Sequence, residues 1–166
     1  MEEDSNSSIT KKVSIMPANQ QDRQNVVGLD GRITSIPKPD YWADMFEQFV
    51  GRDGQHFLIA EAEATADGGS GFAGFIIGEA RAWEFGSQPC GWVLTILVSP
   101  EYQGQGVGEQ LFEAISSRMK EDGVETIRTM IARDDNINMS FFRAQGMMAG
   151  PFIELEKPVD FGREET

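Results

Sequence analysis

The sequence predicts a mixed α/β domain, and three features indicate this fold class. Short runs with strand character alternate with amphipathic helical stretches along most of the chain. One nearly continuous apolar run, residues 91–98, leads into a glycine cluster at residues 103–108, and another helical stretch follows at once. The chain has 166 residues and 40% apolar content, which suffices for one buried core. We therefore assign residues 11–160 to a single domain and residues 1–10 to a flexible acidic tail.

The composition excludes several classes of function. With 27 acidic and 14 basic residues the formal net charge is −13, so nucleic acid and anionic membranes are not expected partners. The negative electrostatic field of the chain favours cationic small molecules such as amines. The alternative is that the charge only keeps an acidic surface soluble. A single cysteine, Cys90, and a single histidine, His56, leave no disulfide and no ordinary zinc site, so we expect no metal and a cytoplasmic location. The acidic N-terminus resembles no signal peptide, and no apolar run is long enough to cross a bilayer.

The first third of the chain predicts a short strand and two helices. Residues 13–15 alternate before Pro17, and a helix is expected over residues 18–27. Residues 40–50 form a clearer helix that Gly51 can end, because five apolar side chains fall on one face. These side chains are Trp42, Met45, Phe46, Phe49 and Val50.

The middle of the chain predicts the sheet. Residues 55–64 and 72–83 are expected to form a β-hairpin, joined by the glycine-rich turn at residues 67–71. The run at residues 91–98 is apolar at almost every position, which is typical of a strand covered on both faces. We therefore place this strand at the centre of the sheet.

Four elements are expected after the glycine cluster. A helix should end at Gly123, because apolar residues recur every four positions before it. Residues 124–132 predict the next strand, and Asp134 or Asp135 can cap a helix that ends at Gly146. Residues 152–156 predict a last strand. The apolar stripe of the first of these helices consists of Val107, Leu111, Ile115 and Met119.

The glycine cluster predicts a phosphate site, because a strand, a glycine turn and a helix in succession leave unpaired backbone N–H groups at the helix N-terminus. A P-loop is excluded because Glu109 and Gln110, not lysine and serine or threonine, follow Gly108. A dinucleotide fingerprint is excluded because Glu109 stands where its last glycine would be. The remaining pattern is Gln or Arg, two residues, Gly, one residue, then Gly or Ala. Gln103, Gly106 and Gly108 fit it, with no Cβ to keep a diphosphate from the main chain.

Residues 96–108 resemble the acyl-CoA motif of the GNAT superfamily of N-acetyltransferases, and residues 141–147 are similar to its second conserved helix. The resemblance covers residues 91–150. It implies a mostly antiparallel central sheet flanked by helices, with a splayed central strand at the CoA site. It also implies acetyl-CoA as cosubstrate and transfer of the acetyl group to a primary amine of a small molecule or peptide, by direct attack in a ternary complex. A homodimer is a further expectation.

The resemblance assigns coenzyme contacts to two segments. The backbone of Ile96, Leu97 and Val98 would pair with the pantetheine arm. In the second helix, Phe142 stands where the family has a proton-donating tyrosine, and Phe142 has no proton to give. Asn138 shares a helix face with Phe142, and Arg143 could reach a phosphate or be ordinary surface charge. The diphosphate would meet the backbone of Gln103, Gly104, Gln105, Gly106, Val107 and Gly108.

The general base is the least defined part of the site. Several relatives carry a glutamate where this chain has Trp92, which we assign to the acceptor site. Glu79 and Glu84 flank the apolar run on the preceding strand and are the candidate bases, since a carboxylate must accept the proton of the attacking amine. The alternative is an ordinary strand-end charge. A noncatalytic module that binds or senses acyl-CoA is the rival interpretation of the whole chain.

Overall fold

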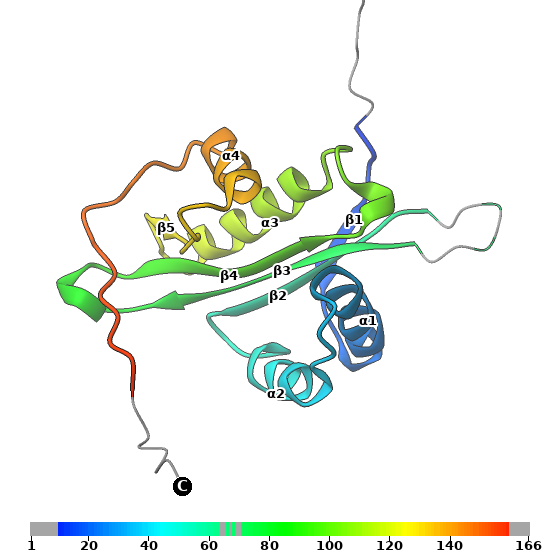
Figure 1. Ribbon diagram of the computed structural model, residues 1–166, viewed down its shortest axis with the longest axis horizontal. Coiled ribbons are helices and arrows are strands. Elements are labelled where there is room, and N and C mark those ends of the chain that lie inside the picture. Colours follow the sequence, from blue (N-terminus) through cyan, green and yellow to red (C-terminus); the bar gives the residue numbers. More distant parts are fainter. Residues whose placement is uncertain (1–9, 64–65, 67, 69–70, 160–166) are drawn as a thin grey trace, which may run out of the picture. The chain divides into compact units, whose positions relative to one another are not determined.

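The computed structural model describes residues 10–63, 66, 68 and 71–159, which divide into two compact units after Met130. The predicted tail lies outside the described residues except for Thr10. The first unit holds a sheet with helices on both faces, and the second holds helix α4 (Figure 1). The strands are β1 (Ser14–Pro17), β2 (Gln55–Glu61), β3 (Phe72–Arg81), β4 (Cys90–Val98) and β5 (Ile127–Arg128). The α-helices are α1 (Arg23–Thr34), α2 (Pro39–Phe49), α3 (Val107–Glu121) and α4 (Asn136–Ala144). Short 3-10 turns are η1 (Gln20–Asp22), η2 (Glu84–Gly86) and η3 (Pro100–Tyr102).

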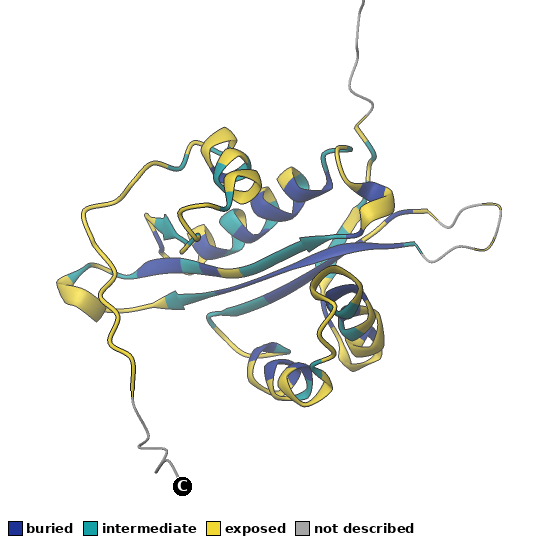
Figure 2. Cartoon of the chain, in the orientation of Figure 1, coloured by how far each residue is buried: buried dark blue, intermediate teal, exposed yellow. Residues whose placement is uncertain are grey.

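The five strands form one sheet in the order β1-β2-β3-β4-β5, which is antiparallel except between β4 and β5. The mixed, mostly antiparallel fold is therefore confirmed. The expectation that residues 91–98 form the centre is wrong, because β4 is the fourth strand and β3 the middle one. Figure 2 shows the difference in burial: β3 is buried along most of its length, whereas the second half of β4 is only half-buried. On the side away from β3, that half has no neighbouring strand within the described chain, since β5 pairs only with Gly91 and Trp92.

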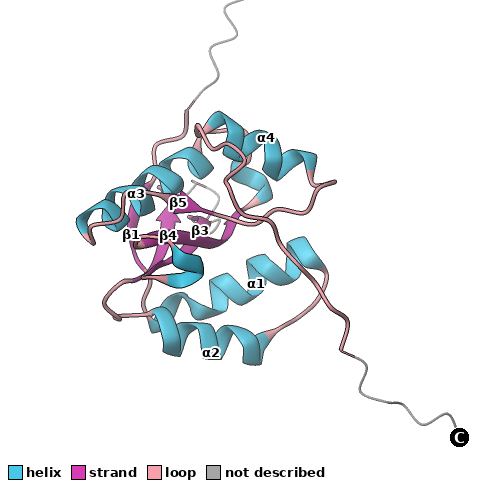
Figure 3. Cartoon of the chain, turned by 90° about the vertical axis from the view of Figure 1, so that its left-hand side faces the viewer, coloured by secondary structure: helices cyan, strands magenta, loops and turns pink. Residues whose placement is uncertain are grey.

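Helices α1 and α2 cover one face of the sheet, and α3 covers the other (Figures 1 and 3). The apolar stripe predicted for α2 is confirmed, and Trp42 and Phe46 pack their rings against Phe57 of β2. Trp42 Nε1 also donates a hydrogen bond of 2.8 Å to the buried Asp30 of α1. Helix α1 runs to Thr34, beyond the expected end at residue 27, and this bond lies in the part of the helix that the sequence did not predict.

Helix α3 packs on β2, β3 and β4, and its predicted stripe is buried there. Val107, Leu111, Ile115 and Met119 are each at most 1% exposed, as the four-residue spacing predicts. Met119 lies so close to the sheet that a Cβ at Gly91 would stand 2.4 Å from its sulfur. The glycine there permits the close approach of helix and strand.

Three predicted elements differ from the structure. Strand β3 ends at Arg81, so Glu84 belongs to the turn η2 and not to the strand. The strand expected over residues 124–132 shrinks to β5, because beyond Arg128 a side chain, Thr129 Oγ1, and not a backbone ladder bonds to Val93. Residues 152–156 carry no regular secondary structure. No helix among the described residues is long and apolar enough to span a bilayer.

Candidate active site

The second half of β4 presents an open backbone edge. Ser99 N donates to Ala73 O at 2.8 Å, which marks a hydrogen-bonded pair between β3 and the end of β4. Such pairs alternate along an antiparallel ladder, so Leu97 bonds to β3 while the N–H groups of Ile96 and Val98 point away from it. No strand of the described chain pairs with that side beyond Trp92.

A β-bulge lies immediately before this open edge. Thr95 pairs with Ile77, but the next β3 residue, Gly78, pairs with Val93, so Leu94 is an extra residue on β4. Leu94 is 44% exposed although it lies within a strand. Bulges bend a strand and re-aim its backbone groups, and they are frequent beside active sites. The bulge thus separates the open edge from the part of β4 that is paired on both sides.

The glycine turn follows at the end of β4 and leads into α3. Gly104 and Gly106 have φ values of 72° and 78°, a left-handed conformation that glycine adopts readily. The first backbone N–H groups of α3 have no partner within the helix and are free to bind an anion. The side chains of Gln103 and Gln105 fold back onto main-chain carbonyls of Val98 and Glu101, at 3.1 and 2.9 Å. These two side chains therefore brace the turn.

An N-terminal segment holds the other side of the turn, and no motif in the sequence predicted it. Lys11 N donates to Gln105 O at 2.8 Å, and the Gln110 side chain bonds Lys11 O and Val13 N at 2.7 and 3.3 Å. A Cβ at Gly106 would meet Thr10 Cγ2 at 3.1 Å. The space beside Gly106 Cα is thus filled by this segment, whereas the sequence suggested that it must be clear for a diphosphate.

An ion pair fixes the start of the turn to α1. Arg32 donates to both carboxylate oxygens of Glu101, at 2.6 and 3.3 Å, and to Ser99 Oγ at 2.8 Å. Ser99 Oγ also donates to Glu101. Hydrogen bonds from Arg32 and Ser99 lower the pKa of Glu101 to about 2. The carboxylate therefore stays ionised over the ordinary pH range.

Glu79 lies at the centre of a polar row that crosses three strands. Its register partners are Gln55 on β2 and Trp92 on β4, so the three side chains are cross-strand neighbours on the face covered by α1 and α2. Among the described side chains, Gln55 Oε1 and Trp92 Nε1 are buried without a hydrogen-bond partner. Buried polar atoms of this kind call for a partner. The row therefore offers one unpaired acceptor and one unpaired donor beside a carboxylate.

Arg81 connects the two candidate bases. Its Nε lies 2.7 Å from Glu79 Oε1, and its NH1 lies 3.3 Å from Glu84 Oε2. The Glu79 side chain is 15% exposed, whereas that of Glu84 is 45% exposed. Glu79 is thus the better shielded carboxylate and the one held opposite Trp92.

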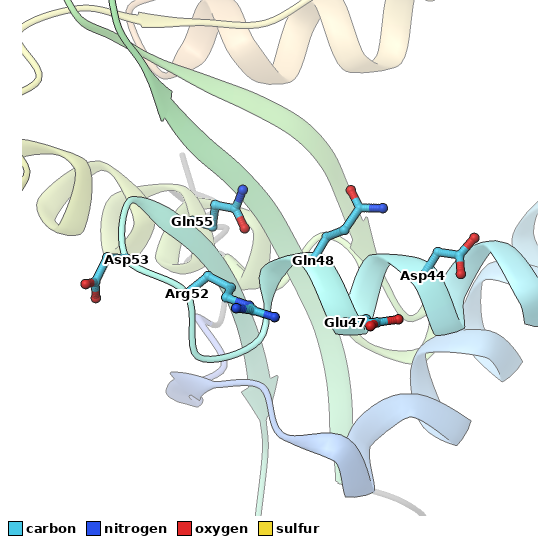
Figure 4. A pocket seen from close by; sticks show the side chains of 6 residues that line it. All are labelled: Asp44, Glu47, Gln48, Arg52, Asp53 and Gln55. Carbon is cyan, nitrogen blue, oxygen red and sulfur yellow. The ribbon is translucent and has the colours of Figure 1, made fainter.

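An acidic surface pocket adjoins this row at Gln55. Its volume is about 590 Å³, and α2, the following turn and the first residue of β2 supply its side chains (Figure 4). Three carboxylates and a single guanidinium give the lining a negative balance. The lining residues are Asp44, Glu47, Gln48, Arg52, Asp53 and Gln55.

Helix α4 belongs to the second unit and carries the remaining predicted coenzyme residues. Of the two expected caps, Asp135 is the residue that caps this helix. Its carboxylate accepts hydrogen bonds from the backbone N–H and the side-chain amide of Asn138, at 3.1 and 2.6 Å. Those bonds lower the pKa of Asp135. Phe142 is buried, whereas Asn138 and Arg143 are exposed. The Asn138 side chain thus serves the helix cap, and coenzyme contacts from α4 remain predictions.

No group of three or more histidine, cysteine or carboxylate side chains is placed to hold a metal ion in the described part of the chain. The candidate site is built from an open strand edge, a bulge, a glycine turn and the polar row around Glu79.

The chain is similar to solved acetyltransferase structures. It matches AAC(6')-Iy in complex with the bisubstrate analogue CoA-S-monomethyl-acetylneamine, with a TM-score of 0.76 and 18% identity over 90% of this chain and 100% of that one. It matches the aminoglycoside 6'-N-acetyltransferase AAC(6')-Ih from Acinetobacter baumannii with a TM-score of 0.71 and 18% identity, over 90% and 100%. It also matches a transcriptional regulator from Bacillus halodurans, with a TM-score of 0.73 and 16% identity over 89% of this chain and 100% of that one. At these identities the likeness shows a shared fold.

A search of curated protein sequences found no match. The model of the acetyltransferase (GNAT) family, in contrast, matches residues 23–147, which include the open edge of β4, the glycine turn and α4. The chain therefore belongs to the GNAT acetyltransferase family.

Proposed function

We propose that this protein is an N-acetyltransferase that transfers the acetyl group of acetyl-CoA to a primary amine. One observation carries the proposal: the backbone N–H groups of Ile96 and Val98 face the side of β4 that no described strand covers, and β4 runs directly into the glycine turn before α3. An extended pantetheine arm can pair with that edge as an added strand, while its diphosphate meets the N–H groups at the start of α3. Solved neighbours of this fold include the aminoglycoside N-acetyltransferase AAC(6')-Iy in complex with CoA.

The direction of β4 supports a proposed position for the reacting end of the coenzyme. The glycine turn lies at the C-terminal end of β4, so a pantetheine arm that starts there runs back past Val98 and Ile96 towards Leu94. The thioester would then reach the bulge at Leu94, just before the residues of β4 that pair with β5, Gly91 and Trp92. Re-aimed backbone N–H groups at the bulge can polarise the thioester carbonyl.

The transfer itself is a direct attack in a ternary complex. The amine nitrogen forms a bond to the carbonyl carbon, the carbon–sulfur bond breaks, and CoA leaves as a thiolate with the electron pair. The surplus proton of the amine passes to a carboxylate, directly or through a water molecule. Because Phe142 has no hydroxyl group, the thiolate leaves without a proton from that position.

Glu79 is the proposed general base, with Glu84 as the alternative. Glu79 lies opposite Trp92, and Trp92 precedes the bulge residue Leu94 by two positions on β4. The neighbours of Glu79 shield its side chain from solvent. Arg81 holds one oxygen of this carboxylate and thereby fixes its orientation. Glu84 lies on the exposed turn η2 and shares only the longer contact with Arg81.

The acceptor is proposed to be a cationic amine. The net charge is −13, and the acidic pocket ends at Gln55, the neighbour of Glu79. Both features raise the local concentration of a cation with several amino groups. Because a solved neighbour of this fold carries an acetylneamine analogue, aminoglycosides are the first acceptors to test.

A release assay for the free thiol tests the proposal. Acetyl-CoA is offered with neamine, sisomicin, spermidine or a lysine peptide, and turnover with any of them is expected. Glu79→Gln should lower kcat by about 100-fold or more, whereas Glu113→Gln on the exposed face of α3 should leave it unchanged. Binding of acetyl-CoA without turnover for every amine would favour the noncatalytic module. If Glu84→Gln lowers kcat and Glu79→Gln does not, Glu84 on the turn η2 is the general base.

A further inference from the structure

The turn η2, which lies between β3 and β4 in the hairpin that these strands form, exposes two aromatic residues (Figure 1). Trp83 is 68% exposed and Phe85 is 72% exposed. Among the described positions of the first unit, they are the two most exposed large apolar residues. A single exposed apolar side chain is ordinary, but two aromatic residues at one short turn form a candidate contact surface.

The backbone of the turn holds both residues in a left-handed conformation. Their φ values are 63° and 53°, and Ser35 is the one other non-glycine residue of the described chain with a positive φ. Bulky residues rarely adopt this conformation. It persists where surrounding contacts enforce it, and such residues are concentrated at sites that bind ligands. The turn thus keeps two aromatic side chains at positions where glycine would be less strained.

Two arginines fix the turn to the neighbouring strands. Arg81 of β3 donates to Glu79 Oε1 at 2.7 Å and to Glu84 Oε2 at 3.3 Å. Arg128 of β5 donates to Ser87 Oγ at 3.1 Å, and Ser87 N donates to Glu84 O at 3.0 Å. The aromatic residues therefore lie on an anchored turn, and Arg81 links that turn to the proposed general base.

We propose that Trp83 and Phe85 bind a second ammonium group of the acceptor, whose first amino group reacts at Glu79. The inference rests on the proposed acetyl transfer to an amine. Trp83 follows Glu79 by four positions, so their Cα atoms lie at most about 14 Å apart. The faces of aromatic rings attract cations. Arg81 also opposes two carboxylates, so its surroundings keep a negative charge. The acceptor class is therefore an amine with at least two amino groups.

Thiol release with spermine and with butylamine tests this proposal, because spermine carries further amino groups and butylamine carries none. The double variant Trp83→Leu, Phe85→Leu keeps apolar side chains and removes both aromatic faces. It should lower the preference for spermine, measured as the ratio of the two kcat/KM values, about 3- to 30-fold, because cation–π contacts are lost. The matched control Trp83→Phe, Phe85→Tyr retains two rings and should keep the parental ratio.

Acrylamide quenching of tryptophan fluorescence measures acceptor binding without turnover. Trp83 is the most exposed of the three tryptophans, so it should dominate the quenching of the free protein. Spermine added with CoA should protect the parent from the quencher, and Trp83→Leu should abolish that protection. The measurement is made at physiological ionic strength, where nonspecific attraction of spermine to the acidic surface is screened.

Two results would overturn the role of the rings. One is a folded leucine double variant with the parental kcat/KM ratio, because spermine would then be selected elsewhere. The other is a parental dimer that this variant converts to monomers in analytical ultracentrifugation, because the rings would then join two copies of the chain. Absence of turnover with every amine, with spermine protection intact, would instead overturn the proposed function.

Discussion

The open edge of β4 predicts that proline has opposite consequences at two adjacent positions. Proline lacks a backbone N–H and is tolerated in a sheet only where that N–H would point away from the ladder. The Ile96 N–H points to the open side, whereas Leu97 exchanges hydrogen bonds with Phe75. Ile96→Pro should therefore leave the β3–β4 ladder intact and remove one donor to the coenzyme. Leu97→Pro should break the ladder.

The expected magnitudes follow from the groups left unpaired. A carbonyl that loses its donor in a buried contact costs about 1–3 kcal/mol, and 1.4 kcal/mol is a factor of ten in affinity. Ile96→Pro should thus weaken CoA binding about 5- to 150-fold. Leu97→Pro leaves a carbonyl of buried β3 unpaired, so a similar energy should appear as lost stability.

Calorimetry with CoA and thermal denaturation measure the two effects separately. Parental CoA affinity in a folded Ile96→Pro variant would show that the Ile96 N–H does not contact the coenzyme. If the two variants lost equal stability, the assigned hydrogen-bond alternation along β4 would be wrong.

Three further predictions concern the turn and the leaving group. Gly106→Ala should cost about 1–2 kcal/mol in unfolding free energy, because its φ of 78° is left-handed and its Cβ would crowd Thr10; urea unfolding measures this, and an unchanged midpoint would contradict it. Phe142→Tyr should raise kcat or leave it unchanged, since it restores a possible proton donor, and a loss beyond tenfold with intact CoA binding would show that the apolar ring is required. The folded-state pKa of Glu101 is about 2, below its ordinary 4.5, so its pairing with Arg32 stabilises the fold above pH 4.5 and is lost as pH falls from there through 2. Glu101→Gln should remove that part of the acid slope in a pH series of thermal melts, and an identical slope in parent and variant would disprove the assignment.

The parts of the fold that the sequence predicted correctly depend on local patterns. The stripe from Val107 to Met119 is helical and buried because a four-residue repeat has one dominant geometry. The strand over residues 91–98 and the glycine turn follow from composition and spacing alone. The position of that strand within the sheet does not, because strand order depends on pairing between distant segments. An apolar run flanking an open edge has the same composition as one in the middle of a sheet.

Parts of the candidate site could not be predicted because they depend on contacts between distant segments. Lys11 lies 94 positions before Gln105 in the sequence, and only the folded chain brings their backbones together. Glu79 and Glu84 were equivalent in sequence, yet the end of β3 at Arg81 separates a shielded strand residue from an exposed turn residue. The unpaired atoms of Gln55 and Trp92 likewise depend on cross-strand register.

Amide hydrogen exchange on β4, resolved by NMR, tests the central claim most directly. In the free protein, the Leu97 amide should already be protected by its bond to β3, while the Ile96 and Val98 amides should exchange faster. Saturating acetyl-CoA should slow exchange at Ile96 and Val98 and leave Leu97 nearly unchanged. Unchanged exchange at Ile96 and Val98 in a sample that demonstrably binds acetyl-CoA would contradict the account, because the coenzyme would then lie away from the open edge of β4.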